Sequence, residues 1–382
     1  MAAPRNGQRN GNGNGYGKSQ GLGPLNHIQQ MRHTQPDPLR VAVVGCGYWG
    51  PKVIRAAAGL PQIEIAALVD RDLDRARSMQ RQFPAARVAP SLTEALADES
   101  IDAVFVATNP ATHVELADEA LSAGKHVLVE KPLALSAVDC RRLGEQARAA
   151  GLVLMAGHTF RFSPAVEHVH QLLRSRELGQ VYYVDSQRLN LGRVRSDVDT
   201  IWNFGPHDVS IIQHWFGRRP LAVHCHAYDY LQSGVPDLAF IVLEYDYAVA
   251  HIHLSWLNPT KVRRMTVVGS RKMVVYDDVA GQVMVHDAGI DREHLGRAFK
   301  DYQSFGEFRL IQRSGDVHIP QLPTVEPLQA QYAHFLDCVR TGSEPKTNAE
   351  DAAGVVEILE AASASYANGG VRIELDEVAA GV

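Results

Sequence analysis

The sequence predicts two folded parts: an α/β domain with a doubly wound parallel sheet, and an α+β domain with a large, open and mostly antiparallel sheet. The chain has 382 residues, which exceeds the usual size of one compact core. Short apolar runs alternate with helical patterns up to about residue 157, and beyond it strand patterns follow one another with few helices between them. We therefore place the first domain at residues 39–157 and the second at residues 158–382.

The segment before the first domain has a different composition. Residues 1–38 are rich in Gly, Asn and Gln and contain few apolar side chains. Such a segment buries too little apolar surface to offset the entropy of ordering. We expect a disordered tail.

Buried strand patterns and helical patterns alternate in the first domain. The runs with little polar alternation, as expected of strands covered on both faces, are Arg40–Val44, Ile63–Val69, Ala103–Ala107 and His126–Val129. Helical periodicity occurs between them, in Leu73–Phe83 and Val114–Ala123. This alternation indicates a right-handed parallel sheet.

The second domain shows strand-like alternation followed by two long helical patterns. The strand patterns are Val181–Arg188, Ala222–Tyr228, Leu238–Tyr245, Val249–Trp256, Arg264–Gly269 and Met273–Tyr276. The helical patterns are Leu328–Arg340, which ends before Gly342, and Ala349–Ala367, which ends before Asn368 and two glycines. We assign both helices to the second domain.

Composition and charge exclude several classes of protein. The 38 lysines and arginines and the 43 acidic residues give a net charge of −5, which provides no general attraction to nucleic acid or an anionic membrane. No apolar run is long enough to span a bilayer, and no signal-peptide pattern is present. Cys46, Cys140, Cys225 and Cys338 lack paired spacing, which is typical of free thiols in a reducing compartment. We expect a cytoplasmic protein without nucleic-acid or membrane partners.

A glycine motif directly follows the first predicted strand and reads Gly45-Cys46-Gly47-Tyr48-Trp49-Gly50. Its glycines suit a tight turn, close approach to a pyrophosphate, and close packing of helix on strand. Asp70 ends the second strand, where a carboxylate can accept hydrogen bonds from ribose hydroxyls. Together these features predict a Rossmann site for NAD, while Arg71 beside the acid leaves NADP as an alternative. Cys46 only needs to be small and is given no redox role.

Further motifs resemble those of the Gfo/Idh/MocA family of sugar and cyclitol dehydrogenases. The resemblance runs from about Leu39 to Gly370. Besides the glycine motif it rests on Ala107-Thr108-Asn109-Pro110-Ala111-Thr112-His113, on Gly124-Lys125-His126-Val127-Leu128-Val129-Glu130-Lys131-Pro132, and on Gly157-His158-Thr159-Phe160-Arg161-Phe162. Lys131 stands at the carboxyl end of a parallel strand, where open α/β sheets bind ligands. The resemblance implies cofactor contacts from Thr108, Asn109, Pro110, His113, Glu130 and Lys131.

The family's catalytic pattern is a lysine beside the nicotinamide and the substrate carbinol, followed later by Asp-x-x-x-His. Lys131 matches the lysine and His207 the histidine, while Asn203 stands at the position of the aspartate. An asparagine forms hydrogen bonds but exchanges no proton near neutral pH. We therefore expect His207 to carry the proton transfer, Lys131 to donate to the carbinol oxygen, and Asn203 to orient its neighbours. Asp208 is interpreted as an N-terminal charge of a helix over Val209–Trp215.

A polar, arginine-rich stretch precedes this histidine. Arginine forks suit phosphate oxygens, and asparagines suit sugar hydroxyls. The predicted substrate contacts are Arg161, Arg188, Asn190, Arg195, Asn203 and His207. The alternative is an exposed charged loop. The pairs His224/His226 and His251/His253 have no recognisable third ligand, so they are interpreted as polar residues of a sheet face, and no metal site is predicted.

Within the family, the segment Arg188–Ser210 is most similar to enzymes acting on nucleotide-activated sugars, notably UDP-N-acetylglucosamine-type 3-dehydrogenases. This resemblance implies NAD-dependent oxidation of a ring hydroxyl, at C3, to a keto sugar. It also implies a homodimer or homotetramer formed through the second sheet. The alternatives are a dehydrogenase of a cyclitol, free sugar or sugar phosphate, a deoxysugar ketoreductase, and a cofactor-binding sensor without turnover, which Asn203 suggests.

Overall fold

A computed structural model describes residues 37–192, 194–290 and 312–375. The tail predicted over residues 1–38 lies outside these ranges except for its last two residues. None of the helices in these ranges is long and apolar enough to cross a bilayer.

The first domain is built on six strands in the order β3-β2-β1-β4-β5-β6, all parallel. The strands are β1 (Leu39–Val44), β2 (Ile63–Val69), β3 (Arg87–Ala89), β4 (Ala103–Val106), β5 (His126–Glu130) and β6 (Leu154–Gly157). The helices that connect them in turn are α1 (Gly50–Ala58), α2 (Leu73–Gln80), α3 (Leu92–Leu96), α4 (His113–Ser122) and α5 (Ala137–Ala149). This order is that of a Rossmann fold, so the predicted parallel sheet is confirmed.

The second sheet has nine strands in the order β14-β13-β12-β11-β7-β10-β9-β8-β15. They are β7 (Val181–Leu191), β8 (Ala222–Tyr228), β9 (Leu238–Glu244), β10 (Val249–Ser255), β11 (Leu257–Gly269), β12 (Met273–Asp277), β13 (Gln282–Ile290), β14 (Gln312–His318) and β15 (Ile373–Glu374). Only β7 and β10 pair in parallel among these neighbours. The predicted open, mostly antiparallel sheet is therefore confirmed.

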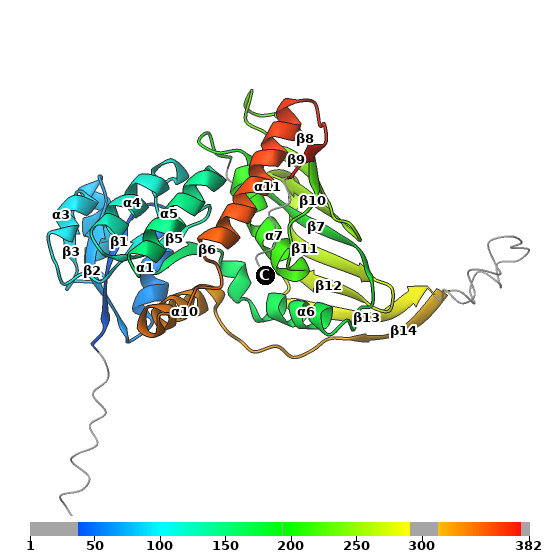
Figure 1. The fold of residues 1–382 in the computed structure, drawn as a ribbon, viewed down its shortest axis with the longest axis horizontal. Helices are drawn as coiled ribbons and strands as arrows, with labels where there is room; N and C mark the ends of the chain where they lie inside the picture. The colour runs from blue at the N-terminus through cyan, green and yellow to red at the C-terminus, as the bar shows by residue number, and fades with distance from the viewer. Residues whose placement is uncertain (1–36, 193, 291–311, 376–382) are drawn as a thin grey trace, which may run out of the picture. The chain divides into compact units, whose positions relative to one another are not determined.

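Helices cover one face of the second sheet, as Figure 1 shows for α7 (Thr200–Phe216) and α11 (Ala349–Ala367). Together with α6 (Pro164–Arg174), they bury an apolar core against the strands. Helix α10 (Pro327–Thr341) instead packs on the first sheet, where its Tyr332 and Phe335 rings lie 4.9 and 5.3 Å from the Phe105 ring of β4. A helix that we assigned to the second domain thus completes the core of the first.

Helix α7 begins nine residues earlier than predicted, at Thr200 instead of Val209. The Asp199 carboxylate caps it by accepting a hydrogen bond from the Trp202 amide at 2.9 Å. Pro206 lies inside the helix, where a proline removes one main-chain hydrogen bond. Asn203 and His207 therefore stand one turn apart on the same face of α7. The interpretation of Asp208 as a charge at the start of a helix is wrong.

Candidate active site

The glycine loop after β1 has the geometry of a dinucleotide cradle. Gly45 has a φ of +99°, and a Cβ there would lie 2.7 Å from the Ala107 carbonyl oxygen. A Cβ at Gly50 would lie 1.9 Å from the Gly45 oxygen, so only glycine lets α1 pack this closely. At Gly47 a Cβ would meet nothing nearer than an Arg75 nitrogen at 3.8 Å. The fold itself leaves room at Gly47, which suits the approach of a pyrophosphate.

Asp70 secures this loop to the end of β2. One carboxylate oxygen accepts a hydrogen bond from the Cys46 amide at 2.8 Å, and the other accepts one from the Asp72 amide at 2.9 Å. A carboxylate oxygen has two lone pairs, so each keeps one acceptor position for a ribose hydroxyl. Arg71 is exposed beside it. The four cysteines are free, as predicted, and all four are buried.

Aromatic side chains continue the loop towards α1. The Lys52 ammonium lies 4.6 Å from the Tyr48 ring centroid and 4.5 Å from that of Trp49. Tyr48 is exposed, whereas Trp49 is half-buried. Its indole N–H is buried without a hydrogen-bond partner among the described residues and lies near Glu130, whose pKa burial raises against a smaller opposing effect of Trp49. Trp49 thus connects the loop with the end of β5.

The segment from Thr108 to His113 supports the end of β4. His113 is fully buried, its Nδ1 lies 2.7 Å from the Pro132 carbonyl oxygen, and its Nε2 lies 3.3 Å from that of Thr108. Pro110 opens a short 3₁₀ turn, η1 (Pro110–Thr112), which the Asn109 side chain caps. His113 thereby joins the main chains at Thr108 and Pro132, and its burial leaves no exposed surface for the cofactor contact that we predicted.

Lys131 reaches across from the first domain to α7. Its Nζ donates a hydrogen bond to the main-chain oxygen of Asn203 at 2.7 Å. Burial lowers the pKa of Lys131 to about 8, against the opposing effect of the Glu130 carboxylate. Burial also raises the pKa of Glu130 to about 7. The two domains therefore meet at an amine and a carboxyl that both titrate near neutral pH.

His207 faces the same region from α7. Its ring packs edge-on against Phe160, with a centroid distance of 5.0 Å. Burial, and then the charge of Lys131, lower the pKa of His207 well below its ordinary value, so the imidazole is neutral at physiological pH.

His158 was not predicted as a site residue and lies in the same region. It is 2% exposed, and burial, Arg161 and Lys131 lower its pKa to about 3. Within the described ranges, both His158 nitrogens, Nδ1 of His207 and Oε1 of Glu130 are buried without a hydrogen-bond partner. Buried polar atoms normally have partners, so this group around Lys131 indicates a binding site for a polar ligand.

Arg188 is held by Asp208 inside the second domain. Its Nε and Nη2 donate to the two carboxylate oxygens at 2.7 and 3.2 Å, and Ser186 donates to the same carboxylate at 2.9 Å. The guanidinium lies 4.8 Å from the centroid of the Phe160 ring, which packs on His207. Arg188 thus contacts the ring that packs on His207, and its bidentate pairing leaves little of its donor fork for the substrate phosphate that we predicted.

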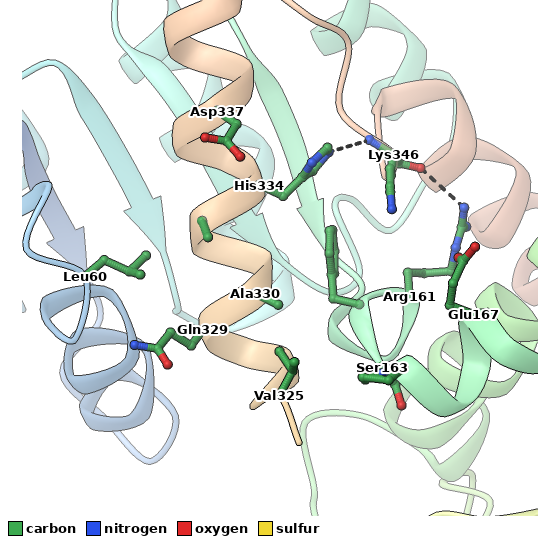
Figure 2. A pocket seen from close by; sticks show the side chains of 13 residues that line it. Leu60, Arg161, Ser163, Glu167, Val325, Gln329, Ala330, His334, Asp337 and Lys346 are labelled. Atoms are coloured by element: carbon green, nitrogen blue, oxygen red, sulfur yellow. Dashed lines mark hydrogen bonds between the residues drawn. The ribbon is translucent and has the colours of Figure 1, made fainter. Parts of the chain in front are cut away.

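Arg161 is directed towards α11. It lies in η2 (Thr159–Phe162), and its Nη1 donates to Asp351 at 2.7 Å. Figure 2 shows its Nη2 reaching the Lys346 carbonyl, beside a cavity of about 650 Å³ that α10 also lines. The structure thus gives Arg161 a carboxylate of the protein as its partner, in place of the substrate contact that we predicted.

The remaining predicted substrate residues lie after β7. Arg195 forks onto Asp197 at 2.9 and 2.6 Å, and Asp197 accepts a hydrogen bond from the Asn109 side chain at 2.6 Å. Asn190 stands at the end of β7, where its side chain folds over Gly192. This loop is thereby joined to the loop that follows β4, in the first domain.

A second cavity, of about 580 Å³, is lined by residues that neighbour this site. Trp49 and Phe160, which neighbour Glu130 and His207, both line it. Its polar lining includes Lys52, Arg55 and Arg263, which the sequence analysis missed. The first two share a helix face at a spacing of three residues, a signal that is visible in the sequence.

A dinucleotide cradle joined to a sheet domain, with a lysine and a neutral histidine between them, defines a nicotinamide-dependent oxidoreductase by its architecture. The comparisons with known proteins agree. The model described as the oxidoreductase family with an NAD-binding Rossmann fold matches residues 39–158, and that of the GFO/IDH/MocA C-terminal domain matches residues 166–275. The chain belongs to the Gfo/Idh/MocA family, and the predicted NAD-binding domain is confirmed.

Relatives within the family act on varied substrates. The chain is 31% identical to 1-carboxy-3-chloro-3,4-dihydroxycyclohexa-1,5-diene dehydrogenase of Comamonas testosteroni, over 75% of this chain and 80% of that protein. It is 31% identical to UDP-N-acetylglucosamine 3-dehydrogenase of Acidithiobacillus ferrooxidans, over 48% of this chain and 56% of that protein. Three other relatives are matched over only 60%, 52% and 40% of their lengths. The crystal structure of GenD2 from gentamicin A biosynthesis, in complex with NAD, is 28% identical, with 89% of this chain and 97% of that chain covered and a TM-score of 0.73.

Proposed function

We propose that this protein is an NAD-dependent dehydrogenase that oxidises a ring hydroxyl, at C3, of a nucleotide-activated sugar to a ketone. The observation that carries the proposal is the hydrogen bond from Lys131 of the first domain to the main chain of α7, the helix that also carries the neutral His207. Lys131 supplies a hydrogen-bond donor to the substrate oxygen that becomes negative, and His207 supplies an acceptor for the proton of that hydroxyl.

The residues present fit a bound nicotinamide dinucleotide. Gly47 leaves room beside the start of α1, and Asp70 keeps acceptor positions for ribose hydroxyls. The unpartnered polar atoms of Glu130, His158 and His207 lie at the far end of this path, around Lys131. The cofactor, when bound, accepts the hydride that leaves the carbinol carbon.

The chain's own residues handle the oxygen and the proton of the substrate. Lys131, with a pKa of about 8, is mostly charged at pH 7, and only one of its three N–H donors is used by Asn203. A second donor can bind the carbinol oxygen and stabilise the negative charge that develops there. Neutral His207 accepts the hydroxyl proton through an unprotonated ring nitrogen. Its Nδ1 has no partner among the described residues.

Asn203 takes part through its main chain. Its carbonyl fixes the Lys131 ammonium against α7, a role that does not depend on the side chain. Replacement of the family's aspartate by asparagine therefore leaves the lysine in position. It removes a negative charge from the neighbourhood of the ammonium, which is consistent with a lysine pKa as low as about 8.

The choice of substrate is supported by the similarity to UDP-N-acetylglucosamine 3-dehydrogenase. Cyclitols, free sugars and sugar phosphates are the competing substrates, and a deoxysugar ketone is the competing substrate in the reverse direction. The sensor alternative is disfavoured because a sensor needs neither a lysine with a lowered pKa nor a buried neutral imidazole.

The test is NADH formation by the purified protein with UDP-N-acetylglucosamine, myo-inositol, glucose and glucose 6-phosphate, each with NAD and with NADP. We expect turnover with the nucleotide sugar and NAD, and none from Lys131→Met, which should still bind NADH. Turnover with unphosphorylated polyols alone would refute the substrate. No turnover with any of these substrates would favour the sensor.

A further inference from the structure

The cavity of about 580 Å³ carries positive charge that the proposed reaction does not use. Lys52 and Arg55 line it from α1, and Arg263 lines it from β11. Within the described ranges, Lys52 and Arg55 form no ion pair, whereas Arg263 lies 3.2 Å from Asp278. The other acid of the lining, Glu326, caps α10 by accepting a hydrogen bond from the Gln329 amide at 2.6 Å. Among the described residues the lining therefore keeps two cations without an acidic partner, although the Lys52 ammonium lies over the Tyr48 and Trp49 rings.

We infer that this cavity is the subsite that binds the phosphoryl groups of the substrate, with Lys52 and Arg55 as its cationic ligands. The inference rests on the proposed function, because it extends the substrate from the reacting carbon into a second, anionic part. Phosphoryl oxygens are favoured here because guanidinium and ammonium groups form charge-assisted hydrogen bonds with them.

The cavity is placed correctly for one substrate to reach both regions. Phe160 lines it and packs on His207, and Trp49 lines it and neighbours Glu130, the residue before Lys131. Arg263 of β11 is the register partner of Arg188 of β7, which lies over the same Phe160 ring. The charge of Arg263 is also among the causes that lower the pKa of His207. The phosphoryl substituent of a sugar bound at His207 would thus extend past the Trp49 and Phe160 rings into the basic cavity.

The dinucleotide does not account for these cations. Its pyrophosphate is expected at Gly47 and its adenosine ribose at Asp70, whereas Arg55 lies more than a turn beyond Gly50 along α1. The cavity's other walls come from η2, β11 and the start of α10, which are not part of the glycine loop. The cavity therefore adjoins the cofactor site through Trp49 and Lys52 and extends beyond it to Arg55, η2 and α10.

The larger cavity, shown in Figure 2, differs in its charges. Arg161 and Lys346 line it, and so do Glu167 and Asp337, so that opposite charges balance. Arg161 is also paired with Asp351. An anion gains less from such a lining than from one with unpaired cations.

The test measures binding of UDP, of N-acetylglucosamine 1-phosphate and of inorganic pyrophosphate to the NADH-saturated protein by calorimetry. NADH saturation keeps these probes out of the dinucleotide site. The variants are Lys52→Gln, Arg55→Gln and the double variant. Arg174→Gln is the matched control, because it removes an exposed cation at the end of α6 that does not line the cavity. NADH affinity, measured by its fluorescence, reports whether the glycine loop is intact.

We expect UDP to bind and each single variant to raise its Kd by about tenfold or more, since a hydrogen bond to a charged group contributes about 1.5–3 kcal/mol and 1.4 kcal/mol is tenfold. Arg174→Gln and the NADH affinity should not change. Stronger binding of UDP than of the sugar phosphate identifies a nucleoside diphosphate as the source of the phosphoryl groups, and the reverse identifies a sugar phosphate. Failure of UDP, sugar phosphate and pyrophosphate alike to bind, or equal binding to wild type and the double variant, would overturn the inference.

The outcome is separable from that of the proposed function. If UDP-N-acetylglucosamine is oxidised and the double variant has an unchanged KM, the subsite is wrong and the dehydrogenase stands. If UDP binding depends on Lys52 and Arg55 but no nucleotide sugar is oxidised, the subsite stands and the proposed substrate is wrong.

Discussion

Removal of the Asp208 carboxylate by Asp208→Ala should destabilise the protein strongly. The side chains of Arg188 and Asp208 are 7% and 1% exposed, and two hydrogen bonds of 2.7 and 3.2 Å join them. Breaking a buried pair leaves an uncompensated charge, which costs about 3–5 kcal/mol. We therefore expect the free energy of unfolding in urea, followed by circular dichroism, to fall by about that amount.

The matched control is Arg195→Met, which breaks a pair of the same chemistry at the surface. The side chains of Arg195 and Asp197 are 35% and 39% exposed, so solvent screens their attraction, and its loss should change stability by less than about 1 kcal/mol. The double variant Arg188→Met/Asp208→Ala should lose less stability than the sum of the single variants, because it leaves neither charge unpaired.

The same variants separate positioning from substrate binding. Because Arg188 contacts the Phe160 ring that packs on His207, Arg188→Met should lower kcat more than it raises KM. Stability loss below about 1 kcal/mol for Asp208→Ala, together with a KM effect alone for Arg188→Met, would refute the structural role. Such a result would instead favour the direct contact between Arg188 and a substrate phosphate that the sequence predicted.

Three further predictions concern the cofactor, the lysine and the assembly. Gly47→Ala should leave the urea midpoint unchanged, because a Cβ meets nothing nearer than 3.8 Å, yet weaken NADH binding in a fluorescence titration; unchanged affinity would contradict the pyrophosphate placement. In wild type, kcat/KM should fall above pH 8 as Lys131, with its pKa of about 8, loses its proton, and the acid limb should lie well below pH 6.5 because the pKa of His207 is lowered. Lys131→Arg should move the alkaline limb above the accessible pH range, because a guanidinium stays charged there. A wild-type kcat/KM that rises through pH 8 would mean that the neutral amine of Lys131 is the base. Tyr183→Glu, on β7 at a residue 46% exposed, should dissociate a homodimer or homotetramer in sedimentation velocity; a monomeric wild type would contradict the proposed assembly through the second sheet.

Features encoded by short-range patterns were predictable from the sequence. The glycine loop and Asp70 could be predicted because the backbone of one β-α-β unit dictates residue type at each position. The strands β3 and β6 were missed, since three or four residues are too few for a periodicity to show. The start of α7 was misplaced because the sequence analysis did not recognise Asp199 as its N-terminal cap.

Long-range pairings could not be predicted. Arg188 and Arg161 look alike in the sequence to phosphate-binding arginines, and their carboxylate partners lie 20 and 190 residues away. The unpaired cations Lys52 and Arg55 become visible only when η2 and α10 close a cavity around them. Whether an arginine is available to a ligand depends on tertiary contacts.

The most direct test of the central claim is hydride transfer itself. UDP-N-acetylglucosamine deuterated at C3 is incubated with NAD and the protein, and the reduced cofactor is analysed by mass spectrometry. Deuterium in the NADH, with a 3-keto sugar product and no label transfer by Lys131→Met, is the predicted result. Unlabelled NADH, or label transfer that persists without the lysine, would contradict the account.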